Sequence, residues 1–229
     1  MKNVIVTGAA GNLGNAVTKH MLDKGFRVIA TVHKEASLKE LPSHDNLHAQ
    51  VVDLQDEEKA KLFVEESMAK YGTIHAALLL VGGFAMGSIT NTGIADIRHQ
   101  LSLNFETAFN AVKPLLPHML NNNNGKIVLI GSRPALQTSA GKSMVAYAMS
   151  KTLVFSLAEY INHEGKGKNV TATVVVPSTI DTPPNRQAMP DAHYENWVTP
   201  ESLAEIIHFV VSDAAAPLRE TVLKVYNNS

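Results

Sequence analysis

The regular alternation of short apolar runs with longer segments of helical periodicity constrains the fold of this chain most strongly. The run at 76–81 is almost entirely apolar, as is typical of a parallel strand that is covered on both faces. The predicted strands are Val4–Thr7, Arg27–Val32, Leu47–Val52, Ala76–Val81, Lys126–Ile130, Val170–Val176 and Thr221–Tyr226. The alternation predicts an α/β fold, a doubly wound parallel sheet of about seven strands with helices on both faces.

Helical periodicity fills most of the segments between these runs. The predicted helices are Leu13–Leu22, Glu57–Tyr71, Ile94–Leu120, Met144–Ile161 and one that opens at Thr199-Pro200-Glu201. Because proline lacks a backbone N–H, Pro114 and Pro117 are expected to bend or divide the third of these helices.

One long connection, residues 177–198, stands out from the short ones. Its Pro183, Pro184 and Pro190 are expected to resist regular structure, and connections of this length often act as lids or binding loops. The chain shows neither a repeat nor a dividing linker, so we expect residues 1–229 to form one domain with a substrate lid at about 177–198.

Composition excludes several classes of function. The net charge of −1 gives no electrostatic footprint for nucleic acid or an anionic membrane. The absence of cysteine excludes disulfides, thiolate metal sites and thiol catalysis, and the ten histidines form no metal-binding pattern, so we expect no metal. With no signal-peptide core and no apolar run of the ~18 residues that a membrane span needs, the sequence favours a cytoplasmic protein.

A glycine-rich turn follows the first predicted strand. It reads Thr-Gly-Ala-Ala-Gly-Asn-Leu-Gly over residues 7–14. A dinucleotide pyrophosphate needs a tight turn, a backbone free of side chains and helix N–H groups aimed at the phosphate. The turn therefore predicts a dinucleotide site formed by Gly8, Gly11, Asn12, Leu13 and Gly14.

The end of the second predicted strand indicates which dinucleotide is bound. An acidic residue there accepts hydrogen bonds from the 2′-hydroxyl of NAD and repels the 2′-phosphate of NADP. Here the strand runs into His33 and Lys34, and no carboxylate comes before Glu35. The sequence favours NADP(H), with NAD(H) possible. Asp53, after the third strand, is a candidate partner for the adenine amine or a residue of a turn or helix cap.

Tyr147 and Lys151 lie one helical turn apart in the fourth predicted helix. A free phenol has a pKa of about 10, and a nearby ammonium group favours its ionised form. The pair can therefore move a proton to or from a substrate oxygen while a dinucleotide moves a hydride.

These motifs, in this order, resemble the short-chain dehydrogenase/reductase family over essentially the whole chain. The resemblance includes Asp53-Leu54, Val81-Gly82-Gly83, Asn104, Ser132, the Tyr147/Lys151 pair and Pro177-Ser-Thr-Ile-Asp-Thr182. It implies a Rossmann-type fold and a catalytic set of Asn104, Ser132, Tyr147 and Lys151. Lys151 would also bond the nicotinamide ribose, Asn104 would hold a water, and Ser132 would bind the substrate oxygen. Pro177, Ile180 and Thr182 would contact the nicotinamide side, Gly82 and Leu54 the rest of the cofactor.

The chain departs from the family's Thr-Gly-x-x-x-Gly-x-Gly pattern in its glycine spacing, and it has Gly82-Gly83 after the fourth strand. Ser139 and Ser143 are alternatives to Ser132, and Arg133 and Arg186 are candidate anchors for an anionic substrate or ordinary surface residues. We expect an oxidoreductase that interconverts a small-molecule carbonyl and a secondary alcohol. The alternatives are a pterin reductase, as in the family's dihydropteridine-reductase-like branch, and a non-catalytic NAD(P)-sensing regulator. The resemblance also implies a homodimer or homotetramer.

Overall fold

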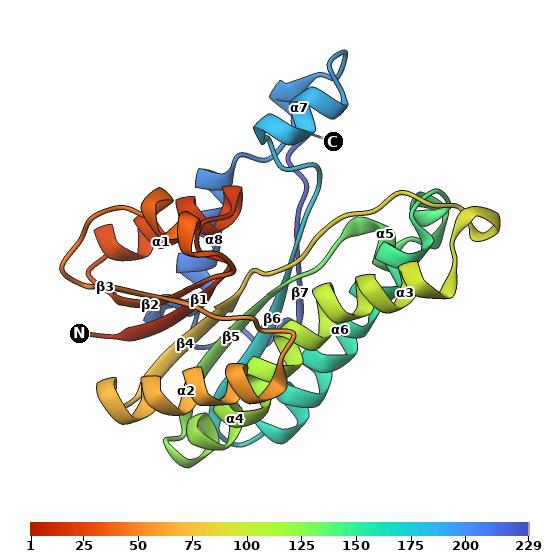
Figure 1. Cartoon of the computed structure of the whole chain (residues 1–229). Helices are drawn as coiled ribbons and strands as arrows, with labels where there is room; N and C mark the ends of the chain where they lie inside the picture. The colour runs from red at the N-terminus through yellow and green to blue at the C-terminus, as the bar shows by residue number, and fades with distance from the viewer. Residues whose placement is uncertain (229) are drawn as a thin grey trace.

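The computed structural model describes residues 1–228 and contains one parallel sheet at its centre (Figure 1). Within those residues the strands lie in the order β3-β2-β1-β4-β5-β6-β7. Their bounds are β1 (Asn3–Thr7), β2 (Arg27–Val32), β3 (Leu47–Val51), β4 (Ile74–Leu79), β5 (Asn124–Ile130), β6 (Asn169–Pro177) and β7 (Val222–Val225). This is the doubly wound Rossmann-type fold that the alternation predicted. The strand order reverses between β1 and β4, and the crevice at such a switch point is where these sheets bind ligands.

Helices cover both faces of the sheet and divide the core into two layers (Figure 1). On one face α1 (Asn12–Asp23) packs beside α8 (Pro200–Val211), and their apolar side chains meet Val4, Val6 and Val28. The other face carries α2 (Glu57–Tyr71), α4 (Thr107–Asn121) and α6 (Val145–Glu164), and α3 (Ile94–Leu101) packs against α6. Because strand residues alternate between the faces, Ile5 belongs to the second layer while its neighbours Val4 and Val6 belong to the first.

The predicted elements agree with the observed ones to within a few residues, except at the prolines. The helix predicted over 94–120 is interrupted by a π-helical turn, η3 (Ser102–Glu106), and not at Pro114 or Pro117, which both lie inside α4. The break occurs where Asn104 turns inward and is buried. Irregular turns of this kind are frequent at functional sites.

The prolines of the long connection begin a helix instead of preventing one. Pro183 and Pro184 occupy the first turn of α7 (Pro183–Ala188), where the missing N–H groups would have no helical partner in any case. Thr182 caps this helix by accepting a hydrogen bond from the Asn185 N–H at 3.4 Å. Further short elements that the sequence did not predict include η1 (Glu35–Glu40) and α5 (Arg133–Leu136).

In the part of the chain that the structure describes, every helix is too short or too polar to cross a lipid bilayer.

Candidate active site

The glycine turn joins β1 to α1 with the backbone packed too closely for side chains. Gly8 has a φ of +66°, in the left-handed region that favours glycine. A Cβ on Gly14 would lie 2.0 Å from the Gly8 carbonyl oxygen, so α1 reaches the turn only because residue 14 is a glycine. The turn leaves the N-terminus of α1, capped by Gly11, facing the switch point of the sheet.

A cleft of about 410 Å³ opens beside this turn. Such a volume lies within the range typical of small-molecule and cofactor pockets. Its walls include the candidate cofactor residues Gly8, Gly11, His33, Asp53, Leu54 and Gly82. The other residues that line it are Ala10, Thr31, Val32, Ser37, Val52, Gln55, Leu80, Val81, Leu103 and Thr107. The candidate cofactor residues Asn12, Leu13, Gly14 and Lys34 lie outside this lining.

The end of the cleft next to β2 contains a residue that the sequence reasoning missed. Ser37, on η1, lines the cleft together with His33, whereas the exposed Lys34 does not. The only carboxylate in the lining is that of Asp53, which accepts a hydrogen bond from the Gln55 N–H at 3.1 Å. Asp56, and not Asp53, caps α2.

Tyr147 and Ser132 face each other at the start of α6. Burial raises the pKa of the Tyr147 phenol, and the nearby Ser132 hydroxyl lowers it in part. Among residues 1–228 the buried Ser132 Oγ has no partner at full hydrogen-bond distance. An unsatisfied buried hydroxyl beside a phenol is what a substrate oxygen would need as its second hydrogen-bond donor. Of the three candidate serines, Ser132 is the one that acts on Tyr147; the Ser143 carbonyl accepts from the Gly87 N–H.

Lys151 extends from the next turn of α6 into a buried position with 5% of its surface exposed. Its Nζ donates to the Ile130 carbonyl at 2.9 Å, and burial lowers its pKa from 10.5 to about 8. A Cβ on Gly82 would lie 3.0 Å from this Nζ, so the glycine keeps the wall of the cleft open towards the lysine. Lys151 thus lies close to the Gly82 wall of the cleft, one helical turn after Tyr147 on α6.

Asn104 is buried in the π-helical turn and holds the segment that follows β4. Its Oδ1 accepts from the Gly83 N–H at 3.0 Å, and its Nδ2 donates to the Gly83 carbonyl at 3.0 Å. The same Nδ2 also lies 3.0 Å from Gln100 Oε1 and 3.2 Å from Ser150 Oγ. Gln100 and Ser150 are buried supports that the sequence reasoning did not single out.

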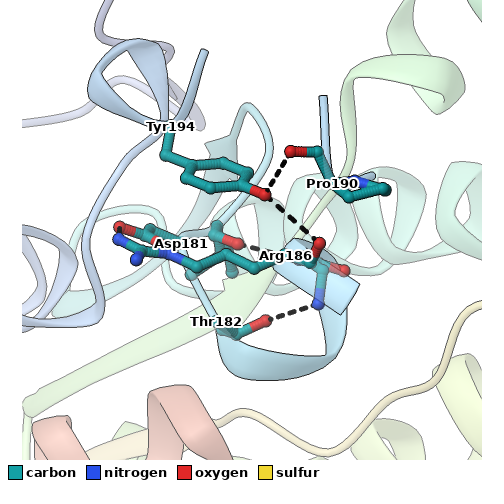
Figure 2. Close-up of polar contacts among 7 residues, drawn as sticks. Asp181, Thr182, Arg186, Pro190 and Tyr194 are labelled. Atoms are coloured by element: carbon teal, nitrogen blue, oxygen red, sulfur yellow. Dashed lines mark hydrogen bonds and ion pairs between the residues drawn. The ribbon is translucent and has the colours of Figure 1, made fainter. Parts of the chain in front are cut away.

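The candidate lid is held by its own side chains (Figure 2). Arg186 forms a bidentate ion pair with Asp181, with Nε–Oδ1 and Nη2–Oδ2 distances of 2.6 and 2.7 Å. The Tyr194 ring lies 4.7 Å from the guanidinium carbon, and its hydroxyl donates to the Pro190 carbonyl at 2.8 Å. Arg186 is therefore paired with Asp181 and Tyr194 within the lid, whereas the sequence analysis named it as a candidate anchor for an anionic substrate.

The ends of the lid are joined by backbone contacts. Ile180, a candidate cofactor residue, forms an isolated parallel bridge with Val198, and Pro177 ends β6 just before it. A second cleft of about 560 Å³ lies between the lid, the start of α8 and the end of β7, and its lining contains none of the candidate catalytic residues. Arg133, the other candidate anchor, donates to Gln137 and lies over the Tyr226 ring.

Comparison with known proteins agrees with this arrangement. The sequence profile of the family described as short chain dehydrogenase matches residues 2–193, and the chain belongs to this family. An uncharacterized oxidoreductase of Bacillus subtilis, YvrD, is 25% identical over 98% of this chain and 94% of its own length. The dihydropteridine reductase of Dictyostelium discoideum is 25% identical over 100% of this chain and 96% of its own length.

The fold also occurs in solved structures. The crystal structure of gox2181 superposes with a TM-score of 0.89 at 23% identity, covering 98% of this chain and 93% of that one. Family members are oxidoreductases that use a nicotinamide dinucleotide, so the cleft beside the glycine turn belongs to a protein of a nucleotide-dependent dehydrogenase or reductase class.

Proposed function

We propose that this protein is an NADP(H)-dependent oxidoreductase that interconverts a carbonyl and a secondary alcohol, with Tyr147 as the proton donor or acceptor. The observation that supports this most strongly is the trio of Tyr147, the unpartnered Ser132 hydroxyl and the buried Lys151, next to a cleft that the glycine turn closes. Each group has a distinct place in carbonyl chemistry.

In the reducing direction, the bound dinucleotide supplies the hydride. The Ser132 hydroxyl and the Tyr147 phenol both donate hydrogen bonds to the substrate oxygen, which gains negative charge as the carbonyl carbon is reduced. Tyr147 then gives its proton to that oxygen, and Lys151 stabilises the phenolate that remains. With a pKa of about 8, Lys151 is mostly protonated at neutral pH. Asn104 acts by holding Gly83, and with it the wall beside Gly82.

After β2, the cleft is lined by His33 and Ser37, and neither these two residues nor Lys34 carries a carboxylate that would repel a 2′-phosphate. This supports the preference for NADP(H). His33 and Ser37 line the cleft where the 2′-phosphate of the adenosine ribose would lie. A serine hydroxyl and an imidazole can both donate hydrogen bonds to a phosphate.

Parallel titration of the purified protein with NADPH and NADH, followed by nicotinamide fluorescence, tests this preference. We expect tighter binding of NADPH, and we expect Ser37→Asp to weaken NADPH binding at least about tenfold while NADH binding is kept, because like charges repel. Lys34→Ala, at the exposed lysine that does not line the cleft, is compared with Ser37→Asp in the same titrations. A preference for NADH in the unsubstituted protein would contradict the proposal.

Tyr147→Phe separates an enzyme from a non-catalytic sensor. Removing the phenolic proton should lower kcat/KM for any carbonyl substrate by about 10²–10⁴-fold while NADPH binding is unchanged. Tyr160→Phe, on an exposed side chain of the same helix, is the control. If Tyr147→Phe kept full activity, the assigned proton transfer would be wrong, and if no carbonyl were ever reduced, the sensor would become the better proposal.

A pterin reductase is the second candidate function. The dihydropteridine reductase of Dictyostelium discoideum aligns with the full length of this chain, and Gly82-Gly83 follows β4 here as noted above. Reduction of a quinonoid dihydropteridine with NADPH or NADH, at a rate above that for simple ketones, would favour this reading over the first.

We further propose a homodimer or homotetramer. Three large exposed side chains that are wholly apolar lie on α4 and α6, namely Phe109, Met149 and Leu153. Burying them against a second copy would remove apolar surface from water. Light scattering should give a multiple of the 24.7 kDa chain mass, and a single 24.7 kDa species would contradict the assembly.

A further inference from the structure

An exposed aromatic ring stands directly beside the candidate proton donor. The ring of Phe84 meets that of Tyr147 edge to face, with centroids 5.2 Å apart and planes at 73°. Even so, 59% of Phe84 is exposed. Because this ring is both exposed and in contact with the candidate proton donor, it offers an apolar surface to a group bound at Tyr147.

The backbone on both sides of Phe84 is fixed. On one side, Asn104 holds both polar backbone groups of Gly83. On the other side, the Gly87 N–H donates to the Ser143 carbonyl at 2.7 Å, and the Gly87 carbonyl accepts from the Val145 N–H at 2.9 Å. We call residues 83–87 the Phe84 shelf.

The two glycines allow the shelf to lie this close to the helices. A Cβ on Gly83 would stand 2.5 Å from Leu103 Cδ2, and one on Gly87 would stand 2.6 Å from Thr92 Oγ1. The exposed ring is therefore carried by a braced segment and not by a free loop. A preorganised apolar surface binds a ligand without a further ordering cost.

Both arginines named as candidate anchors for an anionic substrate have partners within the protein, which favours an uncharged ligand for the ring. Arg186 is paired with Asp181, and Arg133 donates to Gln137 and lies over the Tyr226 ring. Met86, also on the shelf, adds a second exposed apolar side chain. Thioether and aromatic groups together make a surface that favours a flat apolar group.

We propose that Phe84 determines substrate specificity by packing against an aromatic ring attached to the reacting carbonyl, so that the substrate class is the aromatic ketones and aldehydes. This inference rests on the proposed function, because it takes Tyr147 as the group beside the reacting oxygen. A ring conjugated with the carbonyl is held coplanar with it, so a substrate bound at Tyr147 and Ser132 can place its ring along the shelf.

The test compares two ketones with the same number of carbon atoms, acetophenone and cyclohexyl methyl ketone. The Tyr147→Phe protein loaded with NADPH keeps an aromatic ring beside Phe84 and slows turnover by the factor given above, so the initial change in nicotinamide fluorescence reports ketone binding. We expect acetophenone to bind about three to ten times more tightly. Adding Phe84→Leu should abolish the difference, whereas adding Phe209→Leu, at an exposed phenylalanine of α8, should leave it.

With the catalytic tyrosine restored, the ratio of kcat/KM for the two ketones should shift in the same way. Normal NADPH binding with equal affinities for the ketones, no binding of either, or a preference that survives Phe84→Leu would overturn the inference alone. A change of assembly mass in Phe84→Leu would also overturn it, because the ring would then lie in a subunit contact. Failure to bind NADPH would instead contradict the proposed function itself, and the inference with it.

Discussion

At the scale of one residue, burying the charged Lys151 in the candidate site lowers the stability of the folded protein. Burial lowers its pKa from 10.5 to about 8, which corresponds to a penalty of about 3 kcal/mol for keeping it charged in the folded protein. The lysine is charged in both folded and unfolded states below pH 8, so the penalty is complete there. Between pH 8 and 10.5 the folded lysine is neutral, and the penalty disappears.

Lys151→Met should therefore stabilise the ligand-free protein at pH 7. The expected gain is up to about 3 kcal/mol from the removed charge, less about 1 kcal/mol for the lost hydrogen bond to the Ile130 carbonyl. Urea unfolding at pH 7 and pH 10 measures it, and the gain should be smaller at pH 10. A variant that is less stable than the parent at pH 7 would mean that Lys151 is not held charged at a cost.

The site residues that could be predicted from the sequence are those whose spacing along the chain is typical of a known chemical role. Tyr147 and Lys151 follow from a helical turn, and Gly8, Gly11 and Gly14 from their position after a strand. Ser37 and Gln100 carry no such signal, because their places depend on how η1 folds over the cleft and how α3 enters the π-helical turn.

At the scale of the elements, the joint between β1 and α1 depends on Gly14. Gly14→Ala should lower the free energy of unfolding by about 1–3 kcal/mol, because its Cβ would overlap the Gly8 carbonyl oxygen at 2.0 Å and force α1 away from the turn. Gly11→Ala is the matched control, since its Cβ would meet the same oxygen at 3.3 Å. Chemical denaturation of the two variants measures the difference, and equal stabilities would contradict the close joint.

The prolines mark where local sequence rules reach their limit. Pro114 and Pro117 lie within α4, and Pro183 and Pro184 begin α7. A missing N–H disfavours the inside of a helix, but packing of a strongly apolar helix face can outweigh it, and Leu115 and Met119 of α4 are fully buried. Most of the strands were predictable because they are short β-branched or apolar runs with no turn residue in their interior.

At the scale of the whole molecule, several histidines make the free energy of unfolding decrease as the pH becomes acidic. Burial is the largest cause that lowers the pKa of four of them, His48, His75, His118 and His208. The unfolded chain therefore binds more protons than the folded one as pH falls through 6.5, and the folded state loses stability there. The loss continues until the pH passes below the folded pKa values.

The free energy of unfolding should thus be lower at pH 5.5 than at pH 7.5, as measured by urea titration at both values. His208 contacts the His20 and Phe26 rings, so His208→Gln should make the dependence on pH shallower. The exposed His193 is not among the four, and His193→Gln serves as the control. A stability that stays constant between the two pH values would contradict this account.

The central place of β1 has a consequence for synthesis on the ribosome. Its neighbours in the sheet are β2 and β4, and Val4 pairs with Ala76, so one side of the strand stays unpaired until about seventy more residues have been made. At about 5–20 residues per second, this takes roughly 4–14 seconds. During that interval one edge of β1 lacks its β4 partner, so the apolar residues Val4-Ile5-Val6 are open to incorrect strand pairing.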